Sequence, residues 1–212
     1  MSDQDTRDLI LDAAEETFAT KGYHGASVRT ITAKAGVNIA AINYHFGSKE
    51  ALFEAVFRRR ATPINEARCE RLQSIVDKAR KSGRKPVLKD VVRAFVEPTI
   101  HAATYVKRAS ALIGILHQPN AEDSSRARKV FMETIKPSMI MYIDALALAL
   151  PETDKEELKW KVLFSMGTFI TTMHYFAGMF DGFTTIMPKE KNIESIVERL
   201  VAFISGGLEG AR

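Results

Sequence analysis

The sequence has a single cysteine, no secretion signal and no membrane span, and each absence excludes a class of protein. Cys69 cannot form an internal disulfide, which is typical of the reducing cytoplasm, where we expect this protein to act. We interpret Cys69 as an ordinary helix residue, with a thiol sensor as the alternative. Acidic residues at the amino end are incompatible with a secretion signal. The longest uncharged run, residues 162–180, approaches the about 20 residues of a membrane span, but its hydroxyl groups and histidine favour a buried helix and no membrane partner.

Motifs for catalysis and cofactor binding are also missing. The sequence contains no H-E-x-x-H, no G-x-S-x-G and no phosphate-binding P-loop, and no histidine follows a glutamate by three positions, as a di-iron helical bundle requires. Glu97 and His101 are four residues apart and could share a metal ion, but a hydrogen-bonded pair on one helix explains their spacing more simply. We therefore predict no catalytic residue, no metal and no cofactor.

Strand patterns are absent as well, because no stretch alternates apolar and polar residues and no hairpin turn is present. Apolar residues recur instead at helical spacing, which predicts an all-α protein of about nine to ten helices. We divide it into a three-helix headpiece, residues 1–52, and a larger helical domain, residues 53–212, for effector binding and dimerisation. Pro63 and Pro137 are expected to kink or interrupt their helices. Thr153 and Glu156 have the spacing of a capping box at the start of a long helix.

Residues 17–49 contain no aspartate or glutamate, although acidic residues flank them on both sides. We call residues 17–49 the acid-free segment; its cations are Lys21, Arg29, Lys34 and Lys49. The net charge of the whole chain, +4, does not by itself indicate a nucleic acid partner, but a surface without carboxylates suits a polyphosphate.

Two short helices joined by a glycine-containing turn lie within the acid-free segment. Ser27 is a good N-cap for the first of them, and Gly36 favours the left-handed conformation that ends it. Asn38 can cap the second helix, which ends at Gly47. This spacing is typical of a helix-turn-helix, whose second helix lies in the major groove of DNA. An ordinary helical hairpin with a polar outer face is the alternative.

The sequence from Ile10 to Phe53, ILDAAEETFATKGYHGASVRTITAKAGVNIAAINYHFGSKEALF, resembles the N-terminal domain of the TetR family of bacterial transcriptional regulators. The resemblance implies a repressor that binds a pseudo-palindromic operator in double-stranded DNA as a homodimer. It also implies release from DNA by a small effector bound inside the larger domain. A helical adaptor module or a small-molecule enzyme are the alternatives, but the first has no need of the acid-free segment, and the second needs convergent titratable groups that are not seen.

The resemblance assigns DNA contacts position by position. Phosphate contacts are expected from Ser27, Thr30, Tyr44, His45 and Lys49. Base-edge contacts are expected from Asn43 to adenine, from Ala40 and Ala41 to thymine methyl groups, and from Arg29 to either guanine or phosphate. Asn38 is expected to cap the second helix and to touch phosphate, whereas Ile39 could face either the groove or the core.

Methionine and phenylalanine are concentrated in the carboxyl half, where seven of the eight methionines lie between residues 132 and 187. Such deformable side chains suit a pocket for a flexible hydrophobic ligand, although core packing is the favoured explanation for any one of them. The segment GVNIAAINYHFGSK is similar to that of fatty-acid-responsive family members, so we hypothesise a fatty acid or acyl-CoA effector. The excess of basic residues between 58 and 93 would favour the CoA thioester, with a solvated face as the alternative. Candidate lining residues are Phe95, Tyr105, Leu112, Met139, Met166, Met173 and His174.

Two apolar stripes follow the long helix that contains residues 162–180. One comprises Val162, Met166, Phe169, Met173, Phe176 and Phe180, and the other Leu163, Gly167, Ile170, His174 and Gly178. A helix that is apolar on two sides must bury both. We expect one stripe to face the domain interior and the other to face a second subunit, and the sequence does not say which is which. The amphipathic last helix, from Ile193 to Ile204, is expected to join this interface.

Overall fold

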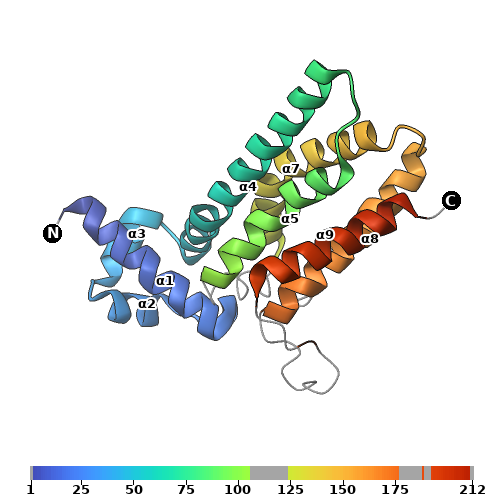
Figure 1. Ribbon diagram of the computed structural model, residues 1–212. Helices are drawn as coiled ribbons and strands as arrows, with labels where there is room; N and C mark the ends of the chain where they lie inside the picture. The colour runs from blue at the N-terminus through green and yellow to red at the C-terminus, as the bar shows by residue number, and fades with distance from the viewer. Residues whose placement is uncertain (1, 106–123, 177–187, 189–191, 211–212) are drawn as a thin grey trace. The chain divides into compact units, whose positions relative to one another are not determined.

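The computed structural model describes residues 2–105, 124–176, 188 and 192–210, and over these residues it is entirely helical (Figure 1). The helices are α1 (Asp3–Gly25), α2 (Val28–Ala35), α3 (Ile39–Phe46), α4 (Lys49–Ser82), α5 (Leu88–Tyr105), α7 (Ser124–Ala149), α8 (Lys155–Phe176) and α9 (Ile193–Glu209). The predicted all-α class is confirmed. The described residues hold eight helices, whereas nine to ten were expected for the whole chain. None of the described helices is long and apolar enough to cross a membrane.

The chain divides into two compact units, which we describe separately. The first contains α1, α2 and α3, α4 as far as Pro63, and the described start of α7 as far as Thr134. The second contains the rest of α4 and of α7 together with α5, α8 and α9.

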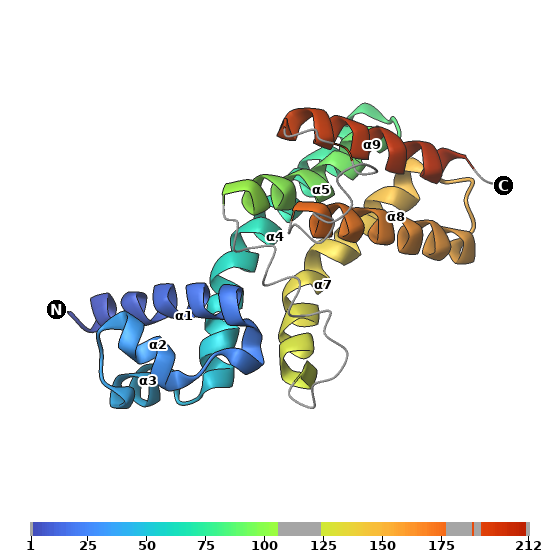
Figure 2. The same ribbon diagram turned by 90° about the horizontal axis from the view of Figure 1, so that it is seen from below.

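The core of the headpiece forms where α1 crosses α2 and α3 (Figure 2). Ile10, Ala14 and Phe18, spaced four apart on α1, are fully buried as their periodicity predicts. The ring of Phe18 packs edge-on against Phe53 of α4, with centroids 5.2 Å apart. Gly22 has a φ of +70° and kinks the end of α1, at the position where the sequence predicts that the first helix closes.

In the second unit, α9 lies alongside α5 and α8 (Figures 1 and 2). Its buried face includes Val197, Leu200 and Ile204, as the amphipathic pattern predicts, whereas Phe203 is exposed. The buried Lys161 of α8 donates a hydrogen bond of 2.8 Å to the carbonyl of Leu208, in the last turn of α9. A cation at the carboxyl end of a helix satisfies carbonyls that lack a partner within the helix.

The helices α4 and α7 continue through Pro63 and Pro137, so neither helix is interrupted, and a kink at either proline stays a prediction. A proline inside a helix removes one backbone hydrogen bond and costs about 3 kcal/mol. Buried side chains follow each proline closely, Asn65 after Pro63 and Ser138 after Pro137, and the Ser138 hydroxyl donates a hydrogen bond of 2.6 Å to Asn65. Contacts of this kind between the two helices offset the local cost.

Candidate functional site

The turn between α2 and α3 has the geometry that the sequence predicts. The Ser27 hydroxyl accepts a hydrogen bond of 3.0 Å from the Thr30 backbone N–H, and the Asn38 side chain accepts one of 3.1 Å from that of Ala40. Between them, Gly36 adopts a φ of +68°, which side chains with a Cβ rarely tolerate. Two caps and one left-handed glycine thus fix the angle at which α3 leaves the turn.

One face of α3 is open to solvent. Ile42 is fully buried beneath the helix, while Asn43 is exposed and Tyr44 is 78% exposed. Ala40 and Ile39 are also exposed, so Ile39 lies on the outer face and not in the core. The expected contact residues of α2 belong to the same region, since Ser27 and Arg29 are exposed and Thr30 is half-buried. The exposed residues of α2 and α3 named here all belong to the acid-free segment, which contributes no carboxylate to them.

Three of the expected contact residues are less open. The side chain of His45 is only 6% exposed, and its Nε2 lies 3.7 Å from a carboxylate oxygen of Asp3. Ala41 is half-buried against the headpiece core. Lys49 is half-buried, with its Nζ 4.3 Å from the centre of the Tyr23 ring. His45 is therefore the residue of the set whose side chain is least suited to reach a phosphate.

The start of α4 is joined to α1 through charged and polar contacts. The Tyr23 hydroxyl donates a hydrogen bond of 2.9 Å to Glu50, and the pKa of Glu50 is held below its ordinary value by its own backbone N–H, by Ser48 and by Tyr23. Further along α4, Arg59 and Arg60 donate to the two carboxylate oxygens of the buried Glu15, at 2.7 and 2.8 Å. Because both arginines hold one carboxylate, α1 is expected to follow any movement of this part of α4.

The second unit buries a cation that sequence patterns do not reveal. Arg68 of α4 is 4% exposed and donates to the Phe95 carbonyl at 2.8 Å, to Thr99 at 2.5 Å and to Asn65 at 3.3 Å. Its guanidinium carbon lies 4.1 Å from the centre of the Phe95 ring. Burial lowers the pKa of Arg68 to about 10, so it remains charged at neutral pH. Among the described residues no carboxylate forms an ion pair with it, which leaves the buried charge neutralised only by dipoles and ring faces.

Tyr142 of α7 packs against Phe95, the ring that Arg68 also contacts. Its ring stacks on Phe95 with centroids 4.3 Å apart, and burial raises the pKa of its hydroxyl above the ordinary value. That hydroxyl is buried and makes no hydrogen bond among the described residues. A buried hydroxyl without a partner costs about 1–3 kcal/mol, so Tyr142 is a candidate to receive a polar ligand atom.

The expected effector residues are only partly brought together. Phe95 and Met173 are buried, and Phe169, which packs edge-on against Phe95, lies one turn from Met173. Met139, Met166 and His174 are half-buried. Leu112 and the side chain of Tyr105 lie outside the described residues.

A separate groove of about 750 Å³ runs between α4 and α5. None of the effector residues expected from the sequence lines it; its cations are Arg71, Lys78, Arg84, Lys85 and Arg93. Arg71 and Arg93 are engaged by Glu97 and Glu198. The groove therefore has the mixed charge of a solvated face, with its excess of cations towards the loop that follows α4.

Cys69 is half-buried, and burial raises the pKa of its thiol. A raised pKa leaves less thiolate, the form that reacts with oxidants and metals. The structure thus favours an ordinary helix residue over a thiol sensor.

Comparisons with known proteins place similarity along most of the chain. Residues 10–56 match the family described as bacterial regulatory proteins, tetR family, and residues 93–207 match a family described as tetracyclin repressor-like, C-terminal domain. Over 61 residues the chain is 43% identical to the HTH-type transcriptional repressor AcnR of Corynebacterium efficiens, which covers 29% of this chain and 32% of that protein. The chain thus spans about a third of the length of the curated relatives it matches.

Solved structures show the same fold over nearly the full length. FadR from Bacillus subtilis, in complex with stearoyl-CoA, has a TM-score of 0.65 at 17% identity and covers 94% of this chain and 98% of its own. The fatty acid degradation regulator FadR from Bacillus halodurans has a TM-score of 0.58 at 20% identity, with 97% and 99% covered. At this identity the likeness concerns the fold alone.

Proposed function

Because the chain belongs to the TetR family of bacterial regulatory proteins, we propose that it represses transcription by binding a pseudo-palindromic operator as a homodimer. The observation that carries the proposal is the exposed outer face of α3, presented by a capped turn within the acid-free segment. We propose residues 1–52 as the DNA-binding domain and residues 53–212 as the effector-binding and dimerisation domain. The contacts assigned to α2, α3 and Lys49 form part of this proposal.

Exposed apolar side chains support the homodimer. Trp160, Leu163 and Phe164 on α8 are each more than half exposed, and Phe203 on α9 is 70% exposed. Trp160 and Phe164 stack with centroids 5.9 Å apart. Large apolar side chains gathered on neighbouring helices are typical of a surface that another protein covers. The stripe that contains Val162, Phe169 and Met173 faces the interior, so the face with Leu163 is the one available to a second copy.

Selecting operators from random DNA with the purified protein tests both parts of the proposal. The enriched sequences are expected to contain two inverted half-sites, since a two-fold protein reads a two-fold site. Replacing Asn43 with alanine is expected to relax specificity at one base pair of each half-site by about 1–3 kcal/mol, because an amide pairs bidentately with adenine. Lys155→Ala, an exposed change on α8, is the control and should leave the enriched sequence unchanged. Enrichment of no sequence would contradict the proposal.

A hydrophobic acid is the effector class we propose. FadR from Bacillus subtilis was solved with stearoyl-CoA, which is a long acyl chain with a polar head. In this chain, Arg68 offers a buried positive charge, and Tyr142, whose hydroxyl makes no hydrogen bond among the described residues, stacks on the same Phe95 ring that Arg68 contacts. Met139 and Met166, one turn from Tyr142 and Phe169 respectively, are deformable and half-buried. We propose that the carboxylate of a fatty acid pairs with Arg68 and Tyr142 while the acyl chain lies among these side chains.

Release from DNA requires the effector to prefer a conformation that does not fit the operator. The double contact of Arg59 and Arg60 with Glu15 supports a path from α4 to the headpiece. A shift of α4 would carry α1 and change the separation of the two recognition helices, which must match successive major grooves about 34–36 Å apart.

Replacing Tyr142 with phenylalanine is expected to weaken ligand binding without destabilising the fold. The unfolding free energy should stay the same or rise by up to about 1–3 kcal/mol, since the change removes a buried hydroxyl that makes no hydrogen bond among the described residues. Affinity for a long-chain fatty acid should fall about tenfold, because a hydrogen bond to a charged group contributes about 1.5–3 kcal/mol. Calorimetric titration with oleate measures the affinity, and Tyr175→Phe is the matched control. A marked loss of stability with unchanged affinity would show that Tyr142 is purely structural.

A further inference from the structure

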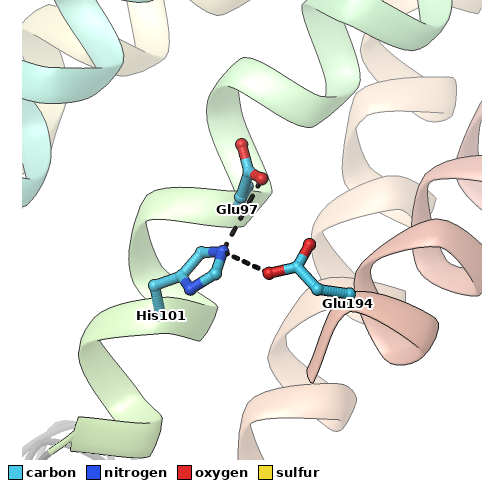
Figure 3. Close-up of side chains that lie close together, drawn as sticks. All are labelled: Glu97, His101 and Glu194. Atoms are coloured by element: carbon cyan, nitrogen blue, oxygen red, sulfur yellow. Dashed lines mark ion pairs between the residues drawn. The ribbon is translucent and has the colours of Figure 1, made fainter. Parts of the chain in front are cut away.

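Glu97 and His101 of α5 converge with Glu194 of α9 on one point between the two helices (Figure 3). The Nε2 atom of His101 lies 3.6 Å from an oxygen of Glu97 and 3.4 Å from an oxygen of Glu194. All three potential ligand atoms lie within 4.8 Å of one another. The third member of the cluster begins α9, so the sequence spacing of Glu97 and His101 could not reveal it.

The two distances from His101 are longer than hydrogen bonds and are compatible with three ligands of one metal ion. Hydrogen bonds from a ring N–H to oxygen are about 2.7–3.2 Å long. A tetrahedral zinc ion with bonds of about 2.0–2.1 Å holds its ligand atoms about 3.4 Å apart. Two of the three edges, which are the distances between potential ligand atoms, are therefore already close to the length that zinc requires. The third edge, between the two carboxylates, can close by rotation of Glu194, whose side chain is 66% exposed.

The surroundings of the cluster also fit a cation. Two carboxylates face a single imidazole nitrogen, and carboxylate oxygens and imidazole nitrogens are both ligands that zinc accepts. The second oxygen of Glu97 is bound by Arg71 of α4, which holds the carboxylate in its orientation towards His101. A fixed outer-shell partner of this kind is typical of metal-binding carboxylates.

Another contact between the same helices shows what an ordinary ion pair looks like here. Arg93 of α5 binds Glu198 of α9 through both carboxylate oxygens, at 2.7 and 2.8 Å. That pair makes direct hydrogen bonds, whereas the distances from His101 Nε2 to the oxygens of Glu97 and Glu194 are longer by more than half an ångström. The buried apolar face of α9, with Val197, Leu200 and Ile204, and this exposed pair hold α9 against α5 without any contribution from Glu194.

We propose that Glu97, His101 and Glu194 bind one Zn²⁺ ion per chain and that the ion joins α5 to the first turn of α9. One nitrogen and two carboxylate oxygens form a three-ligand set that zinc accepts with a water molecule in the fourth position. Mg²⁺ and Ca²⁺ prefer oxygen ligands alone, so the histidine favours zinc over both. The site lies outside the DNA-binding surface and outside the Arg68 and Tyr142 region, and it does not depend on either proposal.

Calorimetric titration of metal-free, untagged, full-length protein with ZnCl₂ tests the site. We expect one ion per chain, with no displacement by millimolar Mg²⁺. His101→Gln and Glu194→Gln are each expected to weaken binding by at least about tenfold, since even outer-shell changes cost about 10–100-fold. Glu198→Gln, one turn along α9, removes a neighbouring carboxylate that is not in the cluster and should leave zinc affinity unchanged.

X-ray absorption at the zinc edge provides a readout that does not depend on the variants. A shell of one nitrogen and three oxygens supports the site, and a sulfur ligand would indicate Cys69 and overturn it. Zinc binding that survives both His101→Gln and Glu194→Gln, or that disappears when the exposed His24 is replaced, would also overturn it.

Discussion

Raising the salt concentration from about 50 to about 200 mM is expected to weaken operator binding about a thousandfold. Each phosphate that a protein cation neutralises releases a counterion, so the logarithm of the affinity falls linearly with the logarithm of the salt concentration. In the acid-free segment, Lys34 is held by Glu16, whereas Lys21 and Arg29 are exposed and Lys49 lies over the Tyr23 ring. If the exposed Lys21 joins the expected contacts Arg29 and Lys49, three cations in each headpiece of the proposed homodimer give about six phosphate contacts and a slope of about −5.

Fluorescence anisotropy with a labelled operator, measured at several salt concentrations, gives this slope directly. Lys49→Gln is expected to reduce it by about two, one for each headpiece, and to weaken binding to all sequences equally. Lys155→Gln removes an exposed cation of α8 and should leave the slope as it was. A slope near zero would contradict a phosphate partner for the acid-free segment, whatever the selected sequence.

The parts of the headpiece that the sequence predicts well are those set by contacts between near neighbours. The side chains of Ser27 and Asn38 cap amides two or three residues away, and the left-handed conformation of Gly36 depends on its own lack of a Cβ. No distant residue is needed to make these choices. The turn and the outward direction of Asn43 and Tyr44 therefore follow from local chemistry.

Local sequence rules predict a helix start less well where two neighbouring residues can each act as the N-cap. Thr153 has the capping-box spacing, but α8 is capped by Asp154, whose carboxylate accepts from the amides of Glu156 and Glu157 at 2.9 and 3.0 Å. The backbone N–H of Thr153 donates instead to Leu150 within the preceding turn. A charged acceptor at the start of a helix also interacts favourably with the helix dipole, which favours aspartate over threonine.

Arg68 shows what a single sequence cannot predict. It belongs to the basic residues between 58 and 93, for which a solvated face is the simplest interpretation. Most of the other basic residues in this range are indeed exposed or half-exposed. Its burial depends on the Phe95 carbonyl and the Thr99 hydroxyl, which come from a different helix. Only the packing of α4 against α5 and α8 distinguishes this arginine from the others, and that packing brings it to the candidate effector residue Phe95.

Replacing Ile42 with alanine is expected to destabilise the headpiece by about 2–5 kcal/mol, the usual cost of removing a fully buried aliphatic side chain. Ile42 belongs to the core cluster that joins α1, α2 and α3, so its loss leaves a cavity beneath the recognition helix. Urea unfolding followed by circular dichroism measures the change. Hydrogen exchange of the α3 amides locates it, because the headpiece and the second unit can unfold separately.

Ile39 provides the matched control for this change, since it is the same residue type one turn earlier on the same helix but is 45% exposed. Ile39→Ala is expected to alter stability by no more than about 0.5 kcal/mol. Any loss of operator affinity in that variant then reports a groove contact, because α3 itself remains seated on its core. If Ile39→Ala destabilises α3 as much as Ile42→Ala does, the outer face is not the free surface that DNA recognition requires.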